Sequence, residues 1–426
     1  MVCNILDYGA DGSGKKNCAS AIQQAIDVCS KTGGRVYIPA GRFLSGFLQI
    51  RSNVELYLEQ GAVLISDLEE QKGGYFLYAC HEKNITISGQ GQIDGQGRLR
   101  FAEDNGDGGY QECPLNVEGE RPRTSFFEDI ENLTVKNITF YDAAFWTLHM
   151  AGCRNVLVDG IRILNNDRGP NNDGIDPDCC RNVVIQDCII ESGDDSIVVK
   201  ATKEMSKRYG DCENVVIRGC ILHSRDSALK IGTESWGNIR NIIFGDCVVR
   251  DCSRAVGIWS RDGGRISHIY IHHITGNTRQ YADCPQRKFA PRWWGKGEPI
   301  FISATKRKEG DQIPGMIEKV FVDHIDFESE SCIFLGGEAY APIREIRIEN
   351  AVIRWKRQSR HIPELFDEQP SERDVYNHEI PCIYGRFASN VKIQGNFTVE
   401  EDLKDIIRKL EITEGCQGFT VREEMD

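Results

Sequence analysis

The middle of the chain holds two short acidic motifs whose residue types could do chemistry together. Asp173 ends an Asn-Asn-Asp run that begins at Asn171, and Asp194 and Asp195 follow Gly193 in a Gly-Asp-Asp run. Three crowded carboxyl groups repel one another, so at least one is expected to have a raised pKa. Hydrolysis of a glycosidic bond uses such a set: one carboxylic acid protonates the leaving oxygen, and a carboxylate activates water or attacks the sugar. The motifs therefore predict that Asp173, Asp194 and Asp195 are catalytic.

The same aspartates could serve a turn or a cation site instead. Aspartate is common in turns, so each residue alone could simply form a turn. Clustered carboxylates also bind hard cations such as Ca²⁺. The combination of the two motifs favours catalysis, and we expect the site to need neither a metal ion nor a cofactor.

An internal repeat supplies the elements that must position the motifs. A short segment of alternating apolar residues begins at positions 132, 155, 182, 214, 241 and 268, so successive starts are 23, 27, 32, 27 and 27 residues apart. Such segments form strands, and rungs of this length stack into a parallel β-helix. Asp173 and Asp194 are 21 residues apart, which is close to one rung. Adjacent strands lie about 5 Å apart, so stacking should bring the three carboxyl groups together.

The predicted fold class is all-β: a right-handed parallel β-helix in which residues 1–426 form a single domain. We expect an N-terminal cap at about residues 1–34, the coil at about 35–398 and a C-terminal extension at about 399–426. A solenoid needs covered ends. The apolar spacing in residues 17–31 predicts a capping helix that begins at Asn17 and is stopped by two glycines at 33 and 34.

Three further segments carry structural expectations. Residues 356–380 are rich in charged and turn-forming residues, which indicates a long loop, and residues 400–410 have a helical pattern. Cys188, Cys220 and Cys247 occupy equivalent places in their repeats. Because free cysteine behaves as a small apolar residue when buried, they are expected to stack inside the coil.

Composition excludes some partners. The formal net charge is −13, which argues against nucleic acid, because phosphates need a basic face. No apolar run is long enough to span a membrane. The start of the chain shows no export signal and the 17 cysteines form no zinc-like pairs, so we expect a cytoplasmic protein with reduced thiols. The expected partner is an oligosaccharide, and the oligomeric state stays open.

The two acidic motifs resemble those of the polygalacturonase family, glycoside hydrolase family 28. Three other segments carry the same resemblance: the opening Asn-Ile-Leu-Asp-Tyr-Gly-Ala-Asp-Gly from Asn4, Val-Tyr-Ile-Pro-Ala-Gly from position 36 and Phe-Trp-Thr-Leu-His from position 145. The similarity covers roughly residues 4–350. It implies an inverting glycosidase in which Asp194 is the general acid and Asp173 and Asp195 hold and deprotonate the water. It also implies that Asn171 positions one of the aspartates.

Two motifs of the family are missing. Where its members have Gly-His-Gly, this chain places Asp226 at the histidine position. Where they have Arg-Ile-Lys, which binds a galacturonate carboxylate in the family, this chain has Gly257 and Trp259 in place of the Arg and the Lys. Carboxylate recognition favours fixed cations with fork geometry. We therefore expect Trp259 to stack on a sugar face instead, and Asp226 to contact substrate.

Other residues are candidates for substrate binding. Arg225, Lys230 and Arg261 could replace the missing cations, or they could be structural. Trp293 and Trp294 are followed by Gly-Lys-Gly, which is typical of a binding loop, although one of them could belong to the core.

These observations lead to a functional hypothesis. The chain is expected to hydrolyse glycosidic bonds of an oligosaccharide, pectin-derived or not, and to act on short oligomers or chain ends rather than on polygalacturonan. The alternatives are another enzyme on the same fold, such as a lyase, epimerase or transferase, and a non-catalytic carbohydrate-binding protein. Fold alone does not dictate chemistry.

Overall fold

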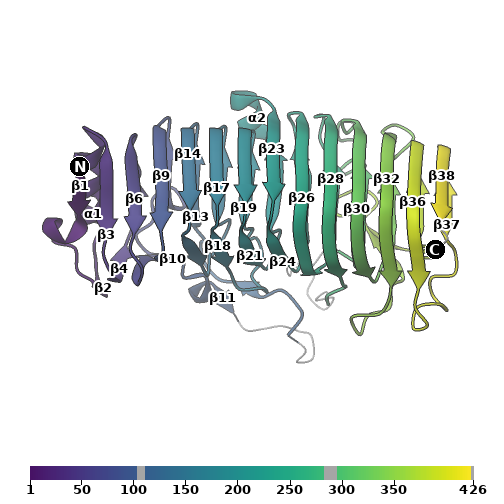
Figure 1. The fold of residues 1–426 in the computed structure, drawn as a ribbon, viewed down its shortest axis with the longest axis horizontal. Helices are drawn as coiled ribbons and strands as arrows, with labels where there is room; N and C mark the ends of the chain where they lie inside the picture. The colour runs from purple at the N-terminus through teal and green to yellow at the C-terminus, as the bar shows by residue number, and fades with distance from the viewer. Residues whose placement is uncertain (103–110, 283–294, 424–426) are drawn as a thin grey trace.

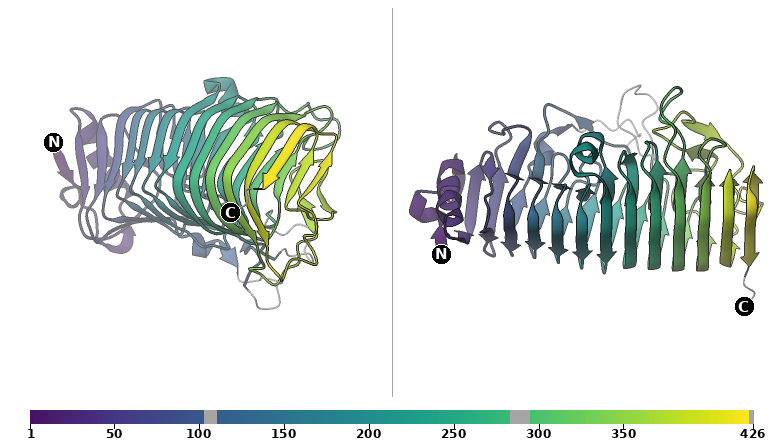
Figure 2. Two further views of the ribbon diagram at one scale, coloured as in Figure 1. Left: turned by 45° about the vertical axis from the view of Figure 1, so that its right-hand side comes forward. Right: turned by 90° about the horizontal axis from the view of Figure 1, so that it is seen from above.

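The computed structural model describes residues 1–102, 111–282 and 295–423 of the chain. The chain winds into a right-handed parallel β-helix, whose strands follow one another along a single long axis from the N-terminal to the C-terminal end (Figure 1). The predicted fold class is confirmed. Figure 2 shows the curved walls of the coil and the helix at its N-terminal end.

Two parallel sheets form the coil in these residues. The larger sheet contains β1 (Val2–Asn4), β2 (Ser13–Asn17), β3 (Gly34–Ile38), β4 (Gly41–Ser45), β6 (Val54–Leu58), β7 (Ala62–Ser66), β9 (Lys83–Gly89), β10 (Gln92–Asp94), β14 (Glu131–Lys136), β15 (Thr139–Tyr141), β17 (Arg154–Asp159), β18 (Arg162–Leu164), β20 (Arg181–Gln186), β21 (Ile189–Ser192), β23 (Cys212–Arg218), β24 (Ile221–Ser224), β26 (Ile239–Cys252), β28 (Ile266–Thr278), β30 (Ile317–Ser329), β32 (Ile343–Trp355), β36 (Ala388–Val399) and β38 (Gln417–Glu423). The smaller sheet contains β5 (Leu48–Gln49), β8 (Tyr75–Cys80), β13 (Arg123–Glu128), β16 (Leu148–Ala151), β19 (Ile175–Asp178), β22 (Ile197–Ala201), β25 (Ser227–Ser235), β27 (Arg254–Ser260), β29 (Glu298–Ala304), β31 (Ile333–Gly336), β35 (Ile383–Arg386) and β37 (Glu411–Glu414).

Short helices and two antiparallel strand pairs lie outside the two parallel sheets. The helical ones are η1 (Ile5–Tyr8), α1 (Ala19–Ser30), η2 (Gly97–Leu99) and α2 (Lys203–Tyr209). Two antiparallel pairs join β11 (Phe101–Ala102) to β12 (Asn116–Val117) and β33 (Leu365–Asp367) to β34 (Val375–Asn377). Helix α2 lies between the repeats that start at 182 and 214, which explains why that spacing is the longest of the series. None of the helices in the described ranges is long and apolar enough to cross a membrane.

Buried aliphatic side chains hold successive rungs together. Val156, Val183, Val215 and Ile242 are register partners in neighbouring strands, and each is 3% exposed or less. Full burial of such a side chain stabilises a fold by about 1.5–3 kcal/mol. One rung could not bury this face alone, so stacking is the source of the core.

An asparagine begins each of six successive rungs and fixes the turn before it. The asparagines at 84, 132, 155, 182, 214 and 241 all have left-handed backbones, with φ from 54° to 64°. Asparagine tolerates this conformation better than most residues. Each side-chain amide donates a hydrogen bond of 2.9–3.2 Å to the asparagine of the preceding rung, which aligns the rungs in register.

The N-terminal cap agrees with the sequence prediction. The apolar face of α1 is buried against the first rung through Ala21, Ile22, Ala25, Ile26 and Cys29. The Asn17 side chain accepts a hydrogen bond from the backbone N–H of Ala19 at the start of the helix. The coil itself begins earlier than expected, because β1 already pairs in parallel with β3.

The C-terminal part departs from the prediction. Residues 401–406 form turns and the rest of 400–410 is irregular, instead of the expected helix, with Leu403 and Ile407 buried against the end of the coil. The apolar residues that suggested a helix instead anchor this segment to the core. The strands continue past residue 398, because β37 and β38 pair with β35 and β36. The 356–380 loop contains the β33–β34 hairpin.

The predicted cysteine stack is present. Cys188, Cys220 and Cys247 are each 2% exposed or less, and the backbone N–H of Cys220 donates to the sulfur of Cys247 at 3.3 Å. The thiols fill a narrow corner of the coil where one rung lies on the next. Every cysteine in the described part of the chain is a free thiol.

Candidate active site

Stacking of two rungs brings the acidic motifs together. Asp173 comes just before β19, and Asp194 and Asp195 lie in the turn between β21 and β22. The backbone N–H of Gly174 donates to the carbonyl of Asp195 at 2.9 Å. As a result, one carboxylate oxygen of each aspartate lies within 4.8 Å of the others. The expected juxtaposition of the three carboxyl groups is therefore present.

A buried asparagine that the sequence reasoning did not single out holds the second motif in place. The side-chain oxygen of Asn172 accepts hydrogen bonds from the backbone N–H groups of Gly193 (2.8 Å) and Asp194 (3.2 Å). Asn172 is 0% exposed. At Gly193 a Cβ atom would lie 2.3 Å from the carbonyl oxygen of Gly169, so only glycine fits there. The Asn-Asn-Asp and Gly-Asp-Asp motifs are therefore one hydrogen-bonded unit.

Asn171 contacts the second motif through its backbone. Its N–H donates to Asp194 Oδ2 at 3.0 Å, while its side-chain oxygen accepts a hydrogen bond from Arg121 at 3.0 Å. The other oxygen of Asp194 accepts the N–H of Asp195 at 3.0 Å. Asp194 is thus oriented by two backbone donors and remains partly exposed to the cleft.

A buried lysine faces Asp173. Lys200 is 4% exposed, and its ammonium lies 3.3 Å from Asp173 Oδ2 and 2.8 Å from Asp176 Oδ1. The same ammonium sits 3.5 Å from the ring centre of Trp146. Burial lowers the pKa of Lys200, but the two carboxylates outweigh this and raise it above its usual value, so the lysine stays charged.

A second buried lysine faces Asp195. Lys230 Nζ lies 2.8 Å from Asp195 Oδ2, and the other oxygen of Asp195 accepts the backbone N–H of Ser227 at 3.2 Å. Burial lowers the pKa of Lys230, while Asp195 and Asp226 raise it and prevail. The predicted substrate-binding residue Lys230 therefore has a partner inside the site, and it lines the cleft.

Burial raises the pKa of three carboxyl groups in the cluster. It is the largest cause for Asp173, Asp195 and Asp226, and neighbouring carboxylates raise the pKa further. The lysines oppose this shift: Lys200 lowers the pKa of Asp173, and Lys230 lowers those of Asp195 and Asp226. Desolvation prevails, which favours retention of a proton within the cluster. These lysines also supply the positive charge that a bound cation would bring, so the arrangement favours a catalytic over a calcium-binding role.

An open cleft of about 1010 Å³ gives access to the carboxyl groups. One wall is the coil and includes Trp146, Asn171 and Asp226. Residues 307–309, 369–372 and 374 also line the cleft, and those from 369 onward belong to the 356–380 loop. This loop is anchored by Glu368, which is 0% exposed and accepts hydrogen bonds from Arg386 at 2.8 and 3.0 Å.

Two of the predicted cations serve the framework. Arg225 donates to Asp167 at 3.0 Å and to the carbonyl oxygen of Gln111 at 2.9 Å, so it ties two loops together. Arg261 is 1% exposed and donates to the backbone carbonyls of Ser303, Glu368 and Pro370 at 2.7–2.9 Å. Neither guanidinium lines the cleft, so the prediction that they contact substrate is wrong for this structure.

The expected sugar-stacking role of Trp259 is also wrong. Its side chain is 0% exposed and packs against Phe301, with ring centres 5.2 Å apart. A Cβ atom at Gly257 would lie 2.1 Å from the Trp259 ring, so the glycine makes room for the indole. The Gly-Ile-Trp pattern is a packing arrangement that fills the space beside the coil. Trp293 and Trp294 lie outside the described residues.

The sequence also matches a known family. The profile described as "Glycosyl hydrolases family 28" aligns with residues 29–275 of the 426. The chain belongs to this family. The resemblance predicted from the motifs is thereby confirmed, and both acidic motifs of this family 28 chain lie inside the matched region.

Individual relatives cover part of their own length. A probable polygalacturonase of Vitis vinifera is 30% identical over 309 residues, which are 66% of this chain and 61% of the relative. An exopolygalacturonase of Zea mays is 26% identical over 203 residues, which are 46% of this chain and 48% of the relative. The family 28 chain thus matches between about half and three fifths of these relatives.

Solved structures support the fold. A family 28 exopolygalacturonase of Yersinia enterocolitica superposes with a TM-score of 0.71 at 16% identity, covering 100% of this chain and 79% of the other. A hyperthermoactive exopolygalacturonase from Thermotoga maritima gives a TM-score of 0.68 at 21% identity, covering 97% and 92%. At these identities the likeness establishes the β-helix alone.

Lys230→Met tests how the buried lysines act on this family 28 site. Loss of the ammonium removes what lowers the pKa of Asp195, so that pKa should rise further. If Asp195 works as a carboxylate, activity is lost as pH falls through its pKa. The acidic limb of the pH profile of kcat should therefore move to higher pH, by about one unit for every 1.4 kcal/mol of lost interaction.

The exposed Lys207→Met variant is the matched control, because Lys207 pairs only with Glu204 on α2 in the described structure. Its pH profile should equal that of the wild type. Removing one partner of a buried pair also costs about 3–5 kcal/mol of stability, so thermal unfolding must be recorded. If the acidic limb is unchanged in folded Lys230→Met, Lys230 does not set the pKa of a carboxylate that activity requires.

Proposed function

We propose that this family 28 protein hydrolyses an O-glycosidic bond of an oligosaccharide. The observation that carries the proposal is the set of three carboxyl groups in one open cleft, two of them paired with buried lysines. General acid–base catalysis needs one protonated and one ionised group within reach of the same bond. The names of the relatives, polygalacturonase and exopolygalacturonase, support a pectin-derived substrate.

In the proposed mechanism Asp194 is the general acid. It is the most accessible of the three aspartates, and its carboxyl group is aimed by the backbone N–H groups of Asn171 and Asp195. It would protonate the leaving oxygen as the bond breaks. Asp173 and Asp195 would hold the attacking water and accept its proton, while Lys200 and Lys230 keep them oriented. The burial that raises the pKa of Asp173 and Asp195 makes them the competing candidates for the acid.

We further propose that the anomeric configuration is inverted, as the motif resemblance implies. Carboxyl groups in inverting enzymes are typically about 6.5–9.5 Å apart, to leave room for water. The nearest oxygens of the three aspartates are within 4.8 Å. The water would therefore have to lie beside the cluster rather than between widely separated groups. Proton NMR of the first product formed tests this step: the inverted anomer is expected, and initial formation of the retained anomer contradicts it.

The charge of the cleft favours substrates with few negative charges. Its lining has eight acidic residues (173, 194, 195, 226, 234, 309, 372 and 374) and four basic ones (200, 230, 307 and 308). Arg307 is already paired with Asp262 at 3.0 Å. A polyanion would meet like charges along its length, which is unfavourable. We therefore propose short or weakly charged oligosaccharides over polygalacturonan.

The 356–380 loop supports action on short oligomers or chain ends. Residues 369–372 and 374 line the same cleft as the three aspartates. Its buried anchor at Glu368, which also accepts a hydrogen bond from Ser303 at 2.8 Å, holds the loop against the coil. A cytoplasmic location, where imported oligosaccharides are met, is part of the proposal and fits the free thiols.

Asp194→Asn separates the proposed acid from the proposed bases. The amide keeps the shape but removes the proton, so kcat on a natural oligosaccharide should fall by about 10²–10⁴-fold with little change in KM. An activated glycoside, such as a nitrophenyl glycoside of the same sugar, needs little protonation and should recover much of the rate. Both substrates are assayed by initial rates over a range of concentrations.

Asp173→Asn and Asp195→Asn are the matched controls, because they remove the groups assigned to water. Neither should be rescued by the better leaving group. If one of these variants is rescued while Asp194→Asn stays inactive on both substrates, the acid is that residue and the assignment of roles is wrong.

Polygalacturonate should be a poor substrate because of the acidic cleft. Its kcat/KM should be at least about tenfold below that of the best short oligosaccharide found by mass-spectrometric screening, which corresponds to about 1.4 kcal/mol. Added salt should narrow this gap, because it screens repulsion between exposed charges. A neutral oligosaccharide serves as the salt control. Rapid release of galacturonate from the polymer at low salt would show that the lining cations dominate.

A further inference from the structure

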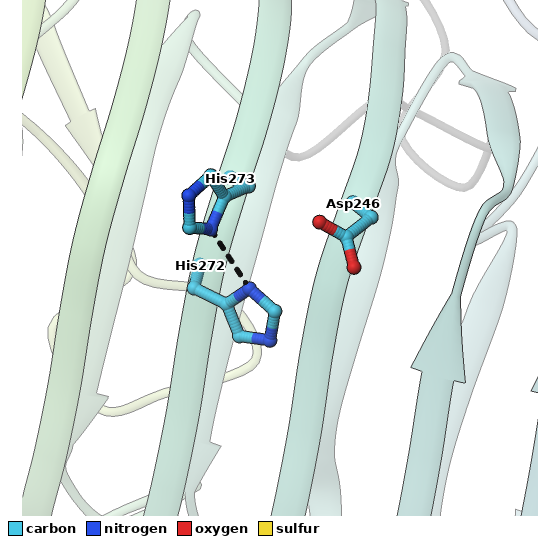
Figure 3. Close-up of side chains that lie close together, drawn as sticks. All are labelled: Asp246, His272 and His273. Carbon is cyan, nitrogen blue, oxygen red and sulfur yellow. Dashed lines mark hydrogen bonds between the residues drawn. The ribbon is translucent and has the colours of Figure 1, made fainter.

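A second cluster of ligating side chains lies outside the cleft. Asp246, His272 and His273 each offer one oxygen or nitrogen atom, and these atoms all lie within 4.8 Å of one another. Figure 3 shows them converging from two neighbouring strands, with Asp246 on one and both histidines on the next. The strands are β26 and β28 of the larger sheet, and none of the three residues lines the catalytic cleft.

The two imidazoles are already close to a chelating arrangement. Nδ1 of His272 and Nδ1 of His273 are 3.1 Å apart, with the rings nearly perpendicular at 81°. Zn–N bonds of about 2.0–2.1 Å in a tetrahedron place two ligand nitrogens about 3.3–3.4 Å apart. A shift of a few tenths of an ångström would therefore let both nitrogens bind one ion.

The surroundings hold the two histidines in place. A Cβ atom at Gly245, the register partner of His272, would lie 2.3 Å from Cε1 of His272, so the imidazole rests where only glycine leaves space. His273 stacks on His324 of the following rung, with ring centres 4.8 Å apart and planes 3° from parallel.

Backbone preference accounts for only part of this cluster. Asp246 and His273 have φ of 55° and 50°, in the left-handed region where Asp and His are enriched. His272 does not share that conformation, yet its ring points to the same place. Within residues 1–102, 111–282 and 295–423, the carboxylate of Asp246 forms no hydrogen bond or ion pair. An unpaired carboxylate beside two imidazoles is thus available as a third ligand.

We propose that Asp246, His272 and His273 bind a transition-metal ion that joins two rungs of the coil. Imidazole nitrogens with one carboxylate suit Zn²⁺, Ni²⁺ or Cu²⁺, whereas Ca²⁺ and Mg²⁺ prefer oxygen ligands alone. Solvent can supply the remaining ligand because the residues are at the surface. An ion that binds the folded chain and not the unfolded one stabilises it, so the role is structural and independent of hydrolysis.

Zn²⁺ titration of untagged protein tests the proposal. Calorimetry should show one Zn²⁺ per chain bound by the wild type, and Zn²⁺ should raise the thermal unfolding midpoint. His272→Gln and Asp246→Asn should each weaken binding at least about tenfold and abolish the rise in midpoint. Their glycosidase activity should equal that of the wild type. A wrong metal-site proposal can therefore be told apart from a wrong proposed function.

His268→Asn is the matched control. His268 lies on the same strand, is exposed and has a left-handed backbone with φ of 58°, but it is not part of the cluster. It should bind Zn²⁺ like the wild type. The proposal is overturned if the wild type binds no Zn²⁺, if His272→Gln binds it unchanged, or if Ca²⁺ displaces it, which would indicate the catalytic carboxylates instead.

Discussion

Parallel stacking of one rung on the next is the constraint on which the whole molecule depends. A rung by itself is a short amphipathic strand set that cannot bury its apolar face. Once Val183 lies over Val156 and under Val215, the backbone hydrogen bonds and the asparagine ladder leave one register. That register places Asp173 beside Asp194 and Asp195, and it equally places Asp246 beside His272 and His273. In this fold, residues that are about one rung apart in the sequence come together to form a site.

Electrostatics decides what the first of these sites can do. Burying several carboxyl groups together is unfavourable, and it is offset here by two lysines that are themselves buried. Lys200 lies on β22 and Lys230 on the adjacent strand β25. Each lysine contacts an aspartate of the preceding rung, Asp173 for Lys200 and Asp195 for Lys230. Burial raises the pKa of Asp173 and Asp195 although these cations lower it, which favours retention of a proton in the cluster. A retained proton beside ionised partners is the chemical basis of an acid–base pair.

Sequence reasoning reached the fold and the carboxyl groups because both depend on local, periodic information. The spacing of Asp173 and Asp194 is visible in the chain, and strand periodicity converts it into proximity. The sequence-based predictions were wrong where the exposure of a side chain depends on which loop or side chain covers its strand. Trp259 was predicted to be exposed and to stack on a sugar, yet the missing side chain at Gly257 leaves space that the indole occupies. Lys200 was overlooked, although a lysine ending the apolar run of β22 is a signal that a buried charge has a partner. The second wall of the cleft comes from a distant loop, and no repeat in the sequence predicts where a loop folds back.

The central claim is that this cluster adds water across a glycosidic bond. The most direct measurement is mass spectrometry of the products formed from a screened oligosaccharide in H₂¹⁸O. Hydrolysis predicts one ¹⁸O atom in the sugar released at the new reducing end, and no unsaturated sugar absorbing in the ultraviolet. Unsaturated products without ¹⁸O would contradict the account and identify a lyase on the same fold.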